Sequence, residues 1–189
     1  SIPANKIPIG WEYFDIGKKG SYSKDSNYER NIYFISPVID HQKKTLYNMA
    51  IKLAKELPDS KIFFKLRPED YDQNVSLFSD DPPELNNFYF ANDGEVHMYE
   101  IIQQCRFIVG VESTLFIEAI SMGAYPFILQ ADFYEGMEFL FRDNPWILFK
   151  NYEELLAKIT KFQDYNVSIR NKLFMDFDKD LVRSLIYKI

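Results

Sequence analysis

The most regular pattern in the chain is a series of short apolar runs, each followed by glycine, proline or small polar residues. Runs of this kind are typical of buried β-strands. Six of them predict strands, at Asn31–Ile35, Lys61–Leu66, Phe88–Ala91, Phe107–Val109, Phe127–Leu129 and Trp146–Phe149.

Between these runs, apolar residues recur at helical spacing. Residues 42–57 place four apolar side chains on one face, and Pro58 follows the end of this pattern. Further helices are predicted over Val96–Gln104, from Ser113 or Thr114 to Gly123, over Tyr152–Phe162 and from about 168 to 189, with shorter ones within 69–85 and Gln130–Arg142.

The predicted strands are apolar throughout, so we expect both of their faces to be buried. Strands that alternate with helices in this way form a parallel sheet with helices on both sides. The predicted fold class is therefore α/β, with a doubly wound, mostly parallel, six-stranded Rossmann-like sheet. Ligands bind such sheets at the carboxyl ends of the strands. The residues that follow the strands are the first candidates for a site, and they are Ser36, Arg67, Asp93, Glu112–Thr114 and Gln130.

The chain divides into three predicted segments. Residues 1–30 are irregular, with scattered glycine and proline, and are expected to be a lead-in or inter-domain linker. Residues 31–165 are expected to form the Rossmann-like domain, and residues 166–189 a C-terminal helical segment.

Composition and charge narrow the function classes. The 189 residues are 47% hydrophobic and 17% aromatic, which indicates a packed core. A net charge of −6 argues against nucleic-acid binding. Cys105 is the single cysteine, so no internal disulfide can form, and we expect it to be buried. No run is long enough to span a bilayer and the first residues show no signal-peptide pattern, so a cytoplasmic location is expected, with any membrane contact peripheral, at the inner face.

The stretch from 106 to 129 carries the most specific chemistry. Its helix is apolar on nearly every side except at Glu118, and a carboxylate there needs a polar partner. Thr114 and Glu118 are four residues apart and share one face near the start of the helix. The pattern predicts a nucleotide site, with phosphate at the amides and hydroxyls of Ser113 and Thr114 and ribose at Glu118. The alternatives are helix capping by the hydroxyls and a structural pairing of Glu118 with a buried Arg or Lys.

Two cations end the second predicted strand. Lys65 and Arg67 would stand at the ligand edge of the sheet, where they suit phosphate neutralisation. The alternative for Arg67 is a surface ion pair with Glu69 or Asp70.

Ser36, Asp93 and His97 complete the predicted site. Ser36 follows the first strand and is assigned to the phosphate. Asp93 precedes the predicted helix Val96–Gln104 and His97 lies near its start, and both are assigned to the base or ribose. No metal site is predicted, because neither His41 nor His97 has a second ligand at metal-binding spacing. Neither the glycine-rich dinucleotide fingerprint nor the P-loop motif occurs, which disfavours those two classes.

Several of these residues lie in motifs that resemble the C-terminal, donor-binding half of GT-B glycosyltransferases, above all bacterial capsule and surface-polysaccharide transferases. That family has Ser-Thr, three residues, Glu-Ala and then a Gly-x-Pro turn. The matching residues are Ser113-Thr114-Leu115-Phe116-Ile117-Glu118-Ala119 and Gly123-Ala124-Tyr125-Pro126, in which the turn is one residue longer. The family's Lys-Pro-His-Pro stretch is matched by Lys65-Leu66-Arg67-Pro68, with arginine in place of histidine. The resemblance covers about residues 31–162.

This resemblance implies a metal-independent glycosyltransferase that needs no cofactor and takes a nucleotide-activated sugar as donor, in bacterial capsule or lipopolysaccharide synthesis. The glycan or lipid-linked acceptor and the general base would belong to an N-terminal half. Lys6–Phe14 resembles the segment by which GT-B chains enter their second domain, and Asp180–Ile189 resembles the helix that packs back toward the other half. The chain by itself is therefore expected to bind nucleotide weakly and to be nearly inactive.

Two other functions stay open. Sugar-nucleotide epimerases share this architecture and would use the same cleft. A non-catalytic flavodoxin-like or receiver-like interaction domain is the second alternative. The receiver version needs an acidic cluster after the first strand, which Ser36–Asp40 does not supply.

Overall fold

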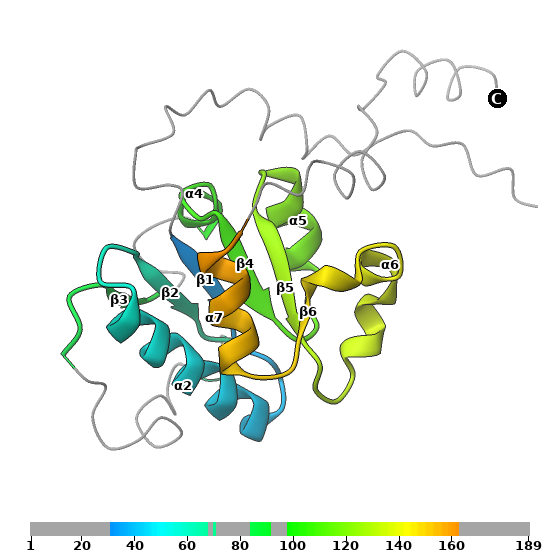
Figure 1. Cartoon of the computed structure of the whole chain (residues 1–189), viewed down its shortest axis with the longest axis horizontal. Helices are drawn as coiled ribbons and strands as arrows, with labels where there is room; N and C mark the ends of the chain where they lie inside the picture. Colours follow the sequence, from blue (N-terminus) through cyan, green and yellow to red (C-terminus); the bar gives the residue numbers. More distant parts are fainter. Residues whose placement is uncertain (1–30, 68–69, 71–83, 92–97, 163–189) are drawn as a thin grey trace, which may run out of the picture.

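The described part of the chain forms one sheet of six parallel strands with helices on both sides (Figure 1). The structure is a computed structural model that describes residues 31–67, 70, 84–91 and 98–162. The strands are β1 (Ile32–Ile35), β2 (Ile62–Lys65), β3 (Phe88–Phe90), β4 (Phe107–Gly110), β5 (Tyr125–Leu129) and β6 (Leu148–Phe149).

The strand order is β3-β2-β1-β4-β5-β6, and every neighbouring pair is parallel. The chain runs outward from β1 to β3 and then returns to the other side of β1 to form β4. The order therefore reverses between β1 and β4, which leaves a crevice at their carboxyl ends. The predicted doubly wound, Rossmann-like α/β fold is confirmed.

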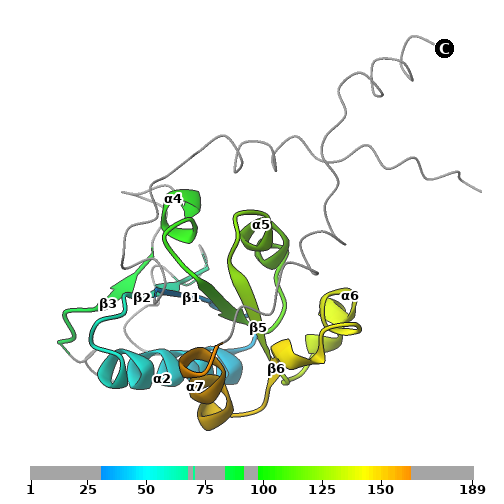
Figure 2. The ribbon, with the colours of Figure 1, turned by 45° about the horizontal axis from the view of Figure 1, so that its top comes forward.

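Both faces of the sheet are covered by helices, as Figure 2 shows. In β1, Ile32 and Phe34 belong to the core on one face, and Tyr33 and Ile35 to the core on the other. This arrangement explains why the strands are apolar throughout. The first face carries α2 (Asp40–Glu56) and α7 (Tyr152–Thr160). The second face carries α4 (Met98–Ile102), α5 (Leu115–Ser121) and α6 (Glu138–Phe141). Two short 3₁₀ turns, η3 (Tyr134–Met137) and η4 (Pro145–Ile147), precede and follow α6.

The turn from α5 into β5 follows from two residues. Gly123 has a φ of 97°, in the left-handed region that ends helices and that glycine adopts without strain. Pro126 lies inside β5, where it cannot donate to a ladder. Its nitrogen faces the β6 side of the strand, and β6 pairs only with Ile128 and Leu129. The proline therefore breaks no pairing.

Two asparagines bond the amino end of the sheet together. The side-chain Nδ2 of Asn31 donates to the Gln104 carbonyl at 2.9 Å, and its Oδ1 accepts from the main-chain amide of Lys61 at 3.0 Å. The Asn87 side chain donates to three carbonyl oxygens around the C-terminal end of α2, those of Ala54, Leu57 and Ser60, at 2.9 to 3.1 Å. These contacts satisfy main-chain groups that no sheet or helix partner reaches.

The observed elements differ in detail from the predicted ones. The helix predicted over 42–57 begins earlier, at Asp40. The predicted strand Trp146–Phe149 is shorter, because Pro145 starts the turn η4, and only Leu148–Phe149 pair with β5. Cys105 is fully buried, as predicted; its thiol contacts the Ile101 carbonyl, and burial raises its pKa.

The predictions for 1–30, for 166–189 and for nearly all of 69–85 concern residues outside those described. Within the described residues, no helix is both long and apolar enough to cross a bilayer.

Candidate functional site

A cleft of about 280 Å³ opens at the carboxyl end of the sheet, where the strand order reverses. Six of the eight predicted site residues lie in its lining. The lining residues are Ile35, Ser36, Lys65, Leu66, Arg67, Met98, Tyr99, Glu112, Ser113, Thr114, Leu115 and Glu118. The structure thus brings together residues from three strand ends and two helices.

Ser36 lies directly after β1, at the base of this cleft. Its amide donates to the Lys65 carbonyl at 2.9 Å, which extends the pairing of β1 with β2 by one residue. Only 3% of Ser36 is exposed, and its hydroxyl oxygen has no hydrogen-bond partner among the described residues. A buried hydroxyl without a partner is unusual, and a bound ligand is one way to satisfy it.

Lys65 and Arg67 reach the cleft because side chains alternate along β2 and its extension. Leu66, between them, is buried in the core on the α2 side of the sheet. Lys65 and Arg67 therefore point to the opposite face, toward α4 and α5, and both line the cleft half-buried. The two cations give this end of the sheet a local positive charge in a protein whose net charge is −6.

The loop after β4 supplies the hydroxyl groups. The Ser113 hydroxyl oxygen accepts from the Leu115 amide at 3.2 Å, and Thr114 is the N-cap of α5 without a side-chain cap bond of its own. Ser113 therefore provides the capping contact that the sequence offered as an alternative reading.

The predicted nucleotide site relies on main-chain amides at the start of α5 that have no acceptor within the protein, but most of these amides are already hydrogen-bonded. The Leu115, Phe116 and Ile117 amides already have acceptors in the preceding turn, because this turn is tight and α5 has only seven residues. The amides of Ser113 and Thr114 have no acceptor among the described residues, and both residues line the cleft.

Glu118 lies one turn into α5 and lines the cleft on the side of Thr114. Its Oε2 atom is buried and has no hydrogen-bond partner among the described residues. No described cation pairs with it, so the structural pairing that the sequence left open is not seen in this part of the chain. Holding a carboxylate oxygen in this state is costly unless a ligand donates to it.

The Glu112 carboxylate would repel a bound anion if it pointed into the cleft. A Cβ atom built at Gly136 would come within 2.6 Å of its Oε1 atom, so the carboxylate lies against η3. It still borders the cleft, on the side of the loop that follows β5.

The remaining predicted residues, Asp93, His97 and Gln130, are not among the described residues that line the cleft. Asp93 and His97 lie outside those residues, although Met98, the next residue in the chain, lines the cleft. Gln130 follows β5, one strand beyond the crevice, and is not part of the lining. Tyr99 was not predicted; its position in the first turn of a helix after a strand is the signal that could have found it.

A buried ion pair behind the cleft was also missed. Lys43 Nζ of α2 donates to Asp70 Oδ1 at 2.6 Å and lies 3.2 Å from Asp40 Oδ1. The exposed fractions of the Lys43 and Asp70 side chains are only 6% and 5%. Burial lowers the pKa of Lys43, but the hydrogen bonds and charges of Asp70 and Asp40 outweigh it, so that the pKa is raised. The lysine therefore stays charged.

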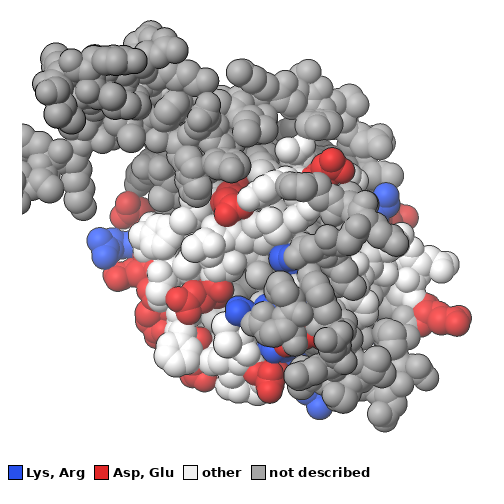
Figure 3. All heavy atoms as spheres, turned by 180° about the vertical axis from the view of Figure 1, so that it is seen from behind, with Lys and Arg blue, Asp and Glu red and all other residues white. Residues whose placement is uncertain are grey.

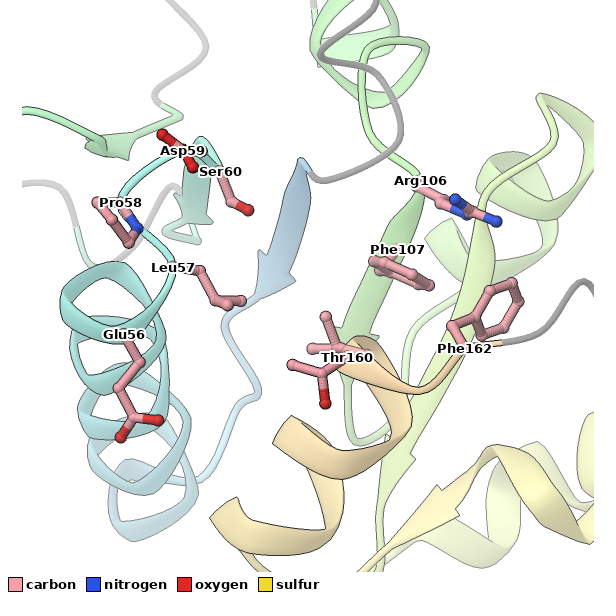
Figure 4. A pocket seen from close by; sticks show the side chains of 10 residues that line it. Glu56, Leu57, Pro58, Asp59, Ser60, Arg106, Phe107, Thr160 and Phe162 are labelled. Atoms are coloured by element: carbon pink, nitrogen blue, oxygen red, sulfur yellow. The ribbon is translucent and has the colours of Figure 1, made fainter.

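A second cavity, of about 390 Å³, lies at the opposite, amino end of the sheet (Figure 4). Its walls are the C-terminal ends of α2 and α7 and the start of β4. The Arg106 guanidinium lies over the rings of Phe107 and Phe162, 5.7 and 5.0 Å from their centroids. No strand presents its carboxyl end to this cavity.

The described surface offers little to other ligand classes. Figure 3 shows acidic and basic side chains interspersed over one face, without a broad basic surface in the coloured, described part. No group of three or more potential metal ligands occurs among the described residues.

Comparisons with known proteins agree with this geometry at the level of fold. No protein-family model and no curated protein matches the sequence. Among solved structures, a spinosyn rhamnosyltransferase complexed with spinosyn aglycone superposes with a TM-score of 0.58 at 14% identity, over 86% of this chain and 46% of that one. The catalytic domain of the Helicobacter pylori cholesterol-α-glucosyltransferase gives 0.51 at 20% identity, over 84% and 99%.

The UDP-GlcNAc 2-epimerase from Neisseria meningitidis, bound to UDP-GlcNAc, gives 0.51 at 14% identity, over 87% of this chain and 45% of that one. The fold resembles that of the matched parts of these glycosyltransferases and of this epimerase. The chain spans less than half of the length of the rhamnosyltransferase and epimerase chains, so its GT-B-like fold corresponds to part of those proteins.

Proposed function

We propose that the cleft at the carboxyl end of the sheet binds the nucleotide part of a sugar donor, and that the domain serves glycosyl transfer. The observation that carries this proposal is that two cations, the hydroxyls of two serines and one threonine, and two carboxylates line a single cleft at the point where the strand order reverses. Two of these groups, the Ser36 hydroxyl and Glu118 Oε2, are buried without a partner among the described residues.

Each side chain has a role that its chemistry suits. Arg67 and Lys65 neutralise the phosphates, and the hydroxyls of Ser36, Ser113 and Thr114 donate to phosphate oxygens. Glu118 accepts hydrogen bonds from ribose hydroxyls through its unpartnered oxygen. Asp93 and His97 are proposed to flank the base, on the side of the cleft marked by Met98.

The chemistry follows from where negative charge develops. Transfer of the sugar leaves a nucleotide with additional charge on its leaving phosphate, and Lys65, Arg67 and the amides of Ser113 and Thr114 would stabilise that charge. The proposal assigns no metal and no cofactor to this step. The general base that activates the acceptor is assigned to an N-terminal half, so we expect this chain alone to turn over little or no donor.

The proposed biological setting is bacterial surface-polysaccharide synthesis at the cytoplasmic side of the membrane. It rests on the Ser113-Thr114 and Glu118-Ala119 motif, which resembles that of capsule transferases. The acceptor would be a glycan or a lipid-linked glycan bound by the other half, with any membrane contact peripheral.

Epimerisation of a sugar nucleotide is the second candidate. It is favoured by the similarity in fold to the Neisseria meningitidis 2-epimerase. Both functions require the same nucleotide cleft and differ in what happens to the sugar. Incubating a sugar nucleotide with the protein in the absence of acceptor separates them, because only the epimerase forms an isomeric donor.

Calorimetric titration of the chain with UDP, GDP, CMP and ADP tests the proposed site. We expect saturable binding of at least one nucleotide, with an affinity roughly thirtyfold lower in Glu118→Ala and in Arg67→Ala. The matched controls are Glu100→Ala and Arg142→Ala, which remove exposed residues of the same types outside the cleft. Failure of all four nucleotides at millimolar concentration would contradict the proposal and favour a non-catalytic interaction domain.

A further inference from the structure

The ion pair between Lys43 and Asp70 joins two segments that follow residues of the cleft lining, since α2 begins four residues after Ser36 and Asp70 follows Arg67. Lys43 lies in the second turn of α2, and Asp70 lies three residues beyond Arg67. Their contact, at 2.6 Å, is almost completely shielded from water. None of the contacts proposed between the cleft and the nucleotide uses this ion pair.

The pair is connected to Arg67 through the main chain. The Asp70 amide donates to the Arg67 carbonyl at 2.9 Å, which links Asp70 directly to the residue that follows Leu66. Leu66 packs in the core under α2, and Arg67 lines the cleft on the opposite face, so the main chain at Arg67 lies between the ion pair and the cleft. A shift of Asp70 would therefore move the main chain that carries Arg67.

A buried ion pair is a poor means of stabilising a fold, since apolar residues of similar size often do as well or better. What such a pair does provide is a defined position, because a buried charge accepts only the geometry that keeps its partner in place. Here one cation faces two carboxylates, Asp70 and Asp40, and only Asp70 is buried. The position that is fixed is that of Asp70.

We propose that Lys43 and Asp70 are positioning residues that hold the main chain of Arg67 in the geometry that binds the donor phosphate. The proposal rests on the proposed function of the cleft. Neither residue contacts the nucleotide; both act through Arg67.

A double-mutant cycle tests this coupling. Nucleotide affinity is measured by calorimetry for wild type, Asp70→Asn, Arg67→Ala and the double variant, with the nucleotide that the wild type binds best. We expect Asp70→Asn to weaken binding about tenfold, the size of a lost charged hydrogen bond. In the Arg67→Ala background the same change should alter affinity less than about twofold, because the contact it supports is already gone. Equal losses in both backgrounds, or no loss in either, would overturn the proposal.

Hydrogen exchange provides a second measurement that needs no nucleotide. Lys43→Met should speed exchange of the main-chain amides between 62 and 70, whereas Lys52→Met should not. Lys52 is the matched control, since it lies on the same helix and pairs with Glu153 at 3.7 Å on the surface. Unchanged exchange in Lys43→Met overturns the positioning role whether or not nucleotide binds. If wild type binds no nucleotide, the proposed function fails, and the positioning of Arg67 for phosphate fails with it.

Discussion

The two ends of the sheet carry cavities of comparable size. They differ in whether the polar side chains near the cavity have hydrogen-bond partners. At the amino end, about 390 Å³ is enclosed beside asparagines that bond to main-chain groups of several segments. At the carboxyl end, about 280 Å³ is enclosed by side chains that include a buried hydroxyl and a buried carboxylate oxygen without partners among the described residues.

This difference shows that cavity size does not identify the functional end of this sheet. Polar groups in a protein interior are normally satisfied by the protein itself. Asn31 and Asn87 do so at the amino end, where their bonds reach the connections around β1, α2 and β4. At the carboxyl end the Ser36 hydroxyl and Glu118 Oε2 have no partner among the described residues, a state that costs free energy and that a bound ligand would relieve.

The largest expected effect is on stability at the amino end. Asn31→Ala removes two hydrogen bonds and leaves the Gln104 carbonyl and the Lys61 amide without partners, so we expect the free energy of unfolding to fall by about 3 kcal/mol. Urea denaturation measures this change. Asn48→Ala, at an exposed position of α2, is the control and should change stability by less than about 0.5 kcal/mol. A loss in nucleotide affinity by folded Asn31→Ala would contradict the separation of the two ends.

The next effect is on binding at the carboxyl end. Glu118→Ala should weaken nucleotide binding by about 2 kcal/mol, roughly thirtyfold, because ribose hydroxyls lose a charged acceptor. The same change should leave the free energy of unfolding equal or raise it by up to about 1 kcal/mol, since it removes an oxygen that the described protein groups do not satisfy. A clear loss of stability would indicate that Glu118 is a structural residue.

A smaller effect is expected from alkaline titration of the pair behind the cleft. The pKa of Lys43 is raised in the folded protein above its ordinary 10.5, so the stability it contributes is complete below pH 10.5 and is lost as pH rises through the higher folded pKa. Urea denaturation above pH 10.5 should therefore show a steeper decline for wild type than for Asp70→Asn, which lacks the partner that raises this pKa. Parallel declines would show that Asp70 does not hold the lysine charged.

The smallest effect is expected from filling the larger cavity. Thr160 lines it at the exposed end of α7, so Thr160→Trp can occupy part of the space without entering the core. We expect nucleotide affinity to stay within about twofold of wild type. A larger loss, measured by the same calorimetry, would move the candidate site to the amino end.

The sequence alone determined the layers, because a buried parallel strand needs apolar residues on both faces and the chain shows them in short runs. It also located the ends of several elements, such as Gly123 after α5, and it identified Ser36, Lys65, Arg67, Ser113, Thr114 and Glu118 as residues that follow strands or begin a helix. These features depend on neighbours in the chain. Local patterning and backbone geometry are therefore sufficient to predict them.

Only the tertiary structure decided which of those residues meet. The reversal of strand order between β1 and β4 brings the ends of β1, β2 and β4 into one cleft and leaves Gln130 outside it. The bond from Lys43 to Asp70 and the bonds of Asn31 join residues that are 27 to 73 positions apart. No periodicity or motif predicts such contacts, because they arise when separate helices and loops pack around the same sheet and must satisfy the polar groups that burial has isolated from water.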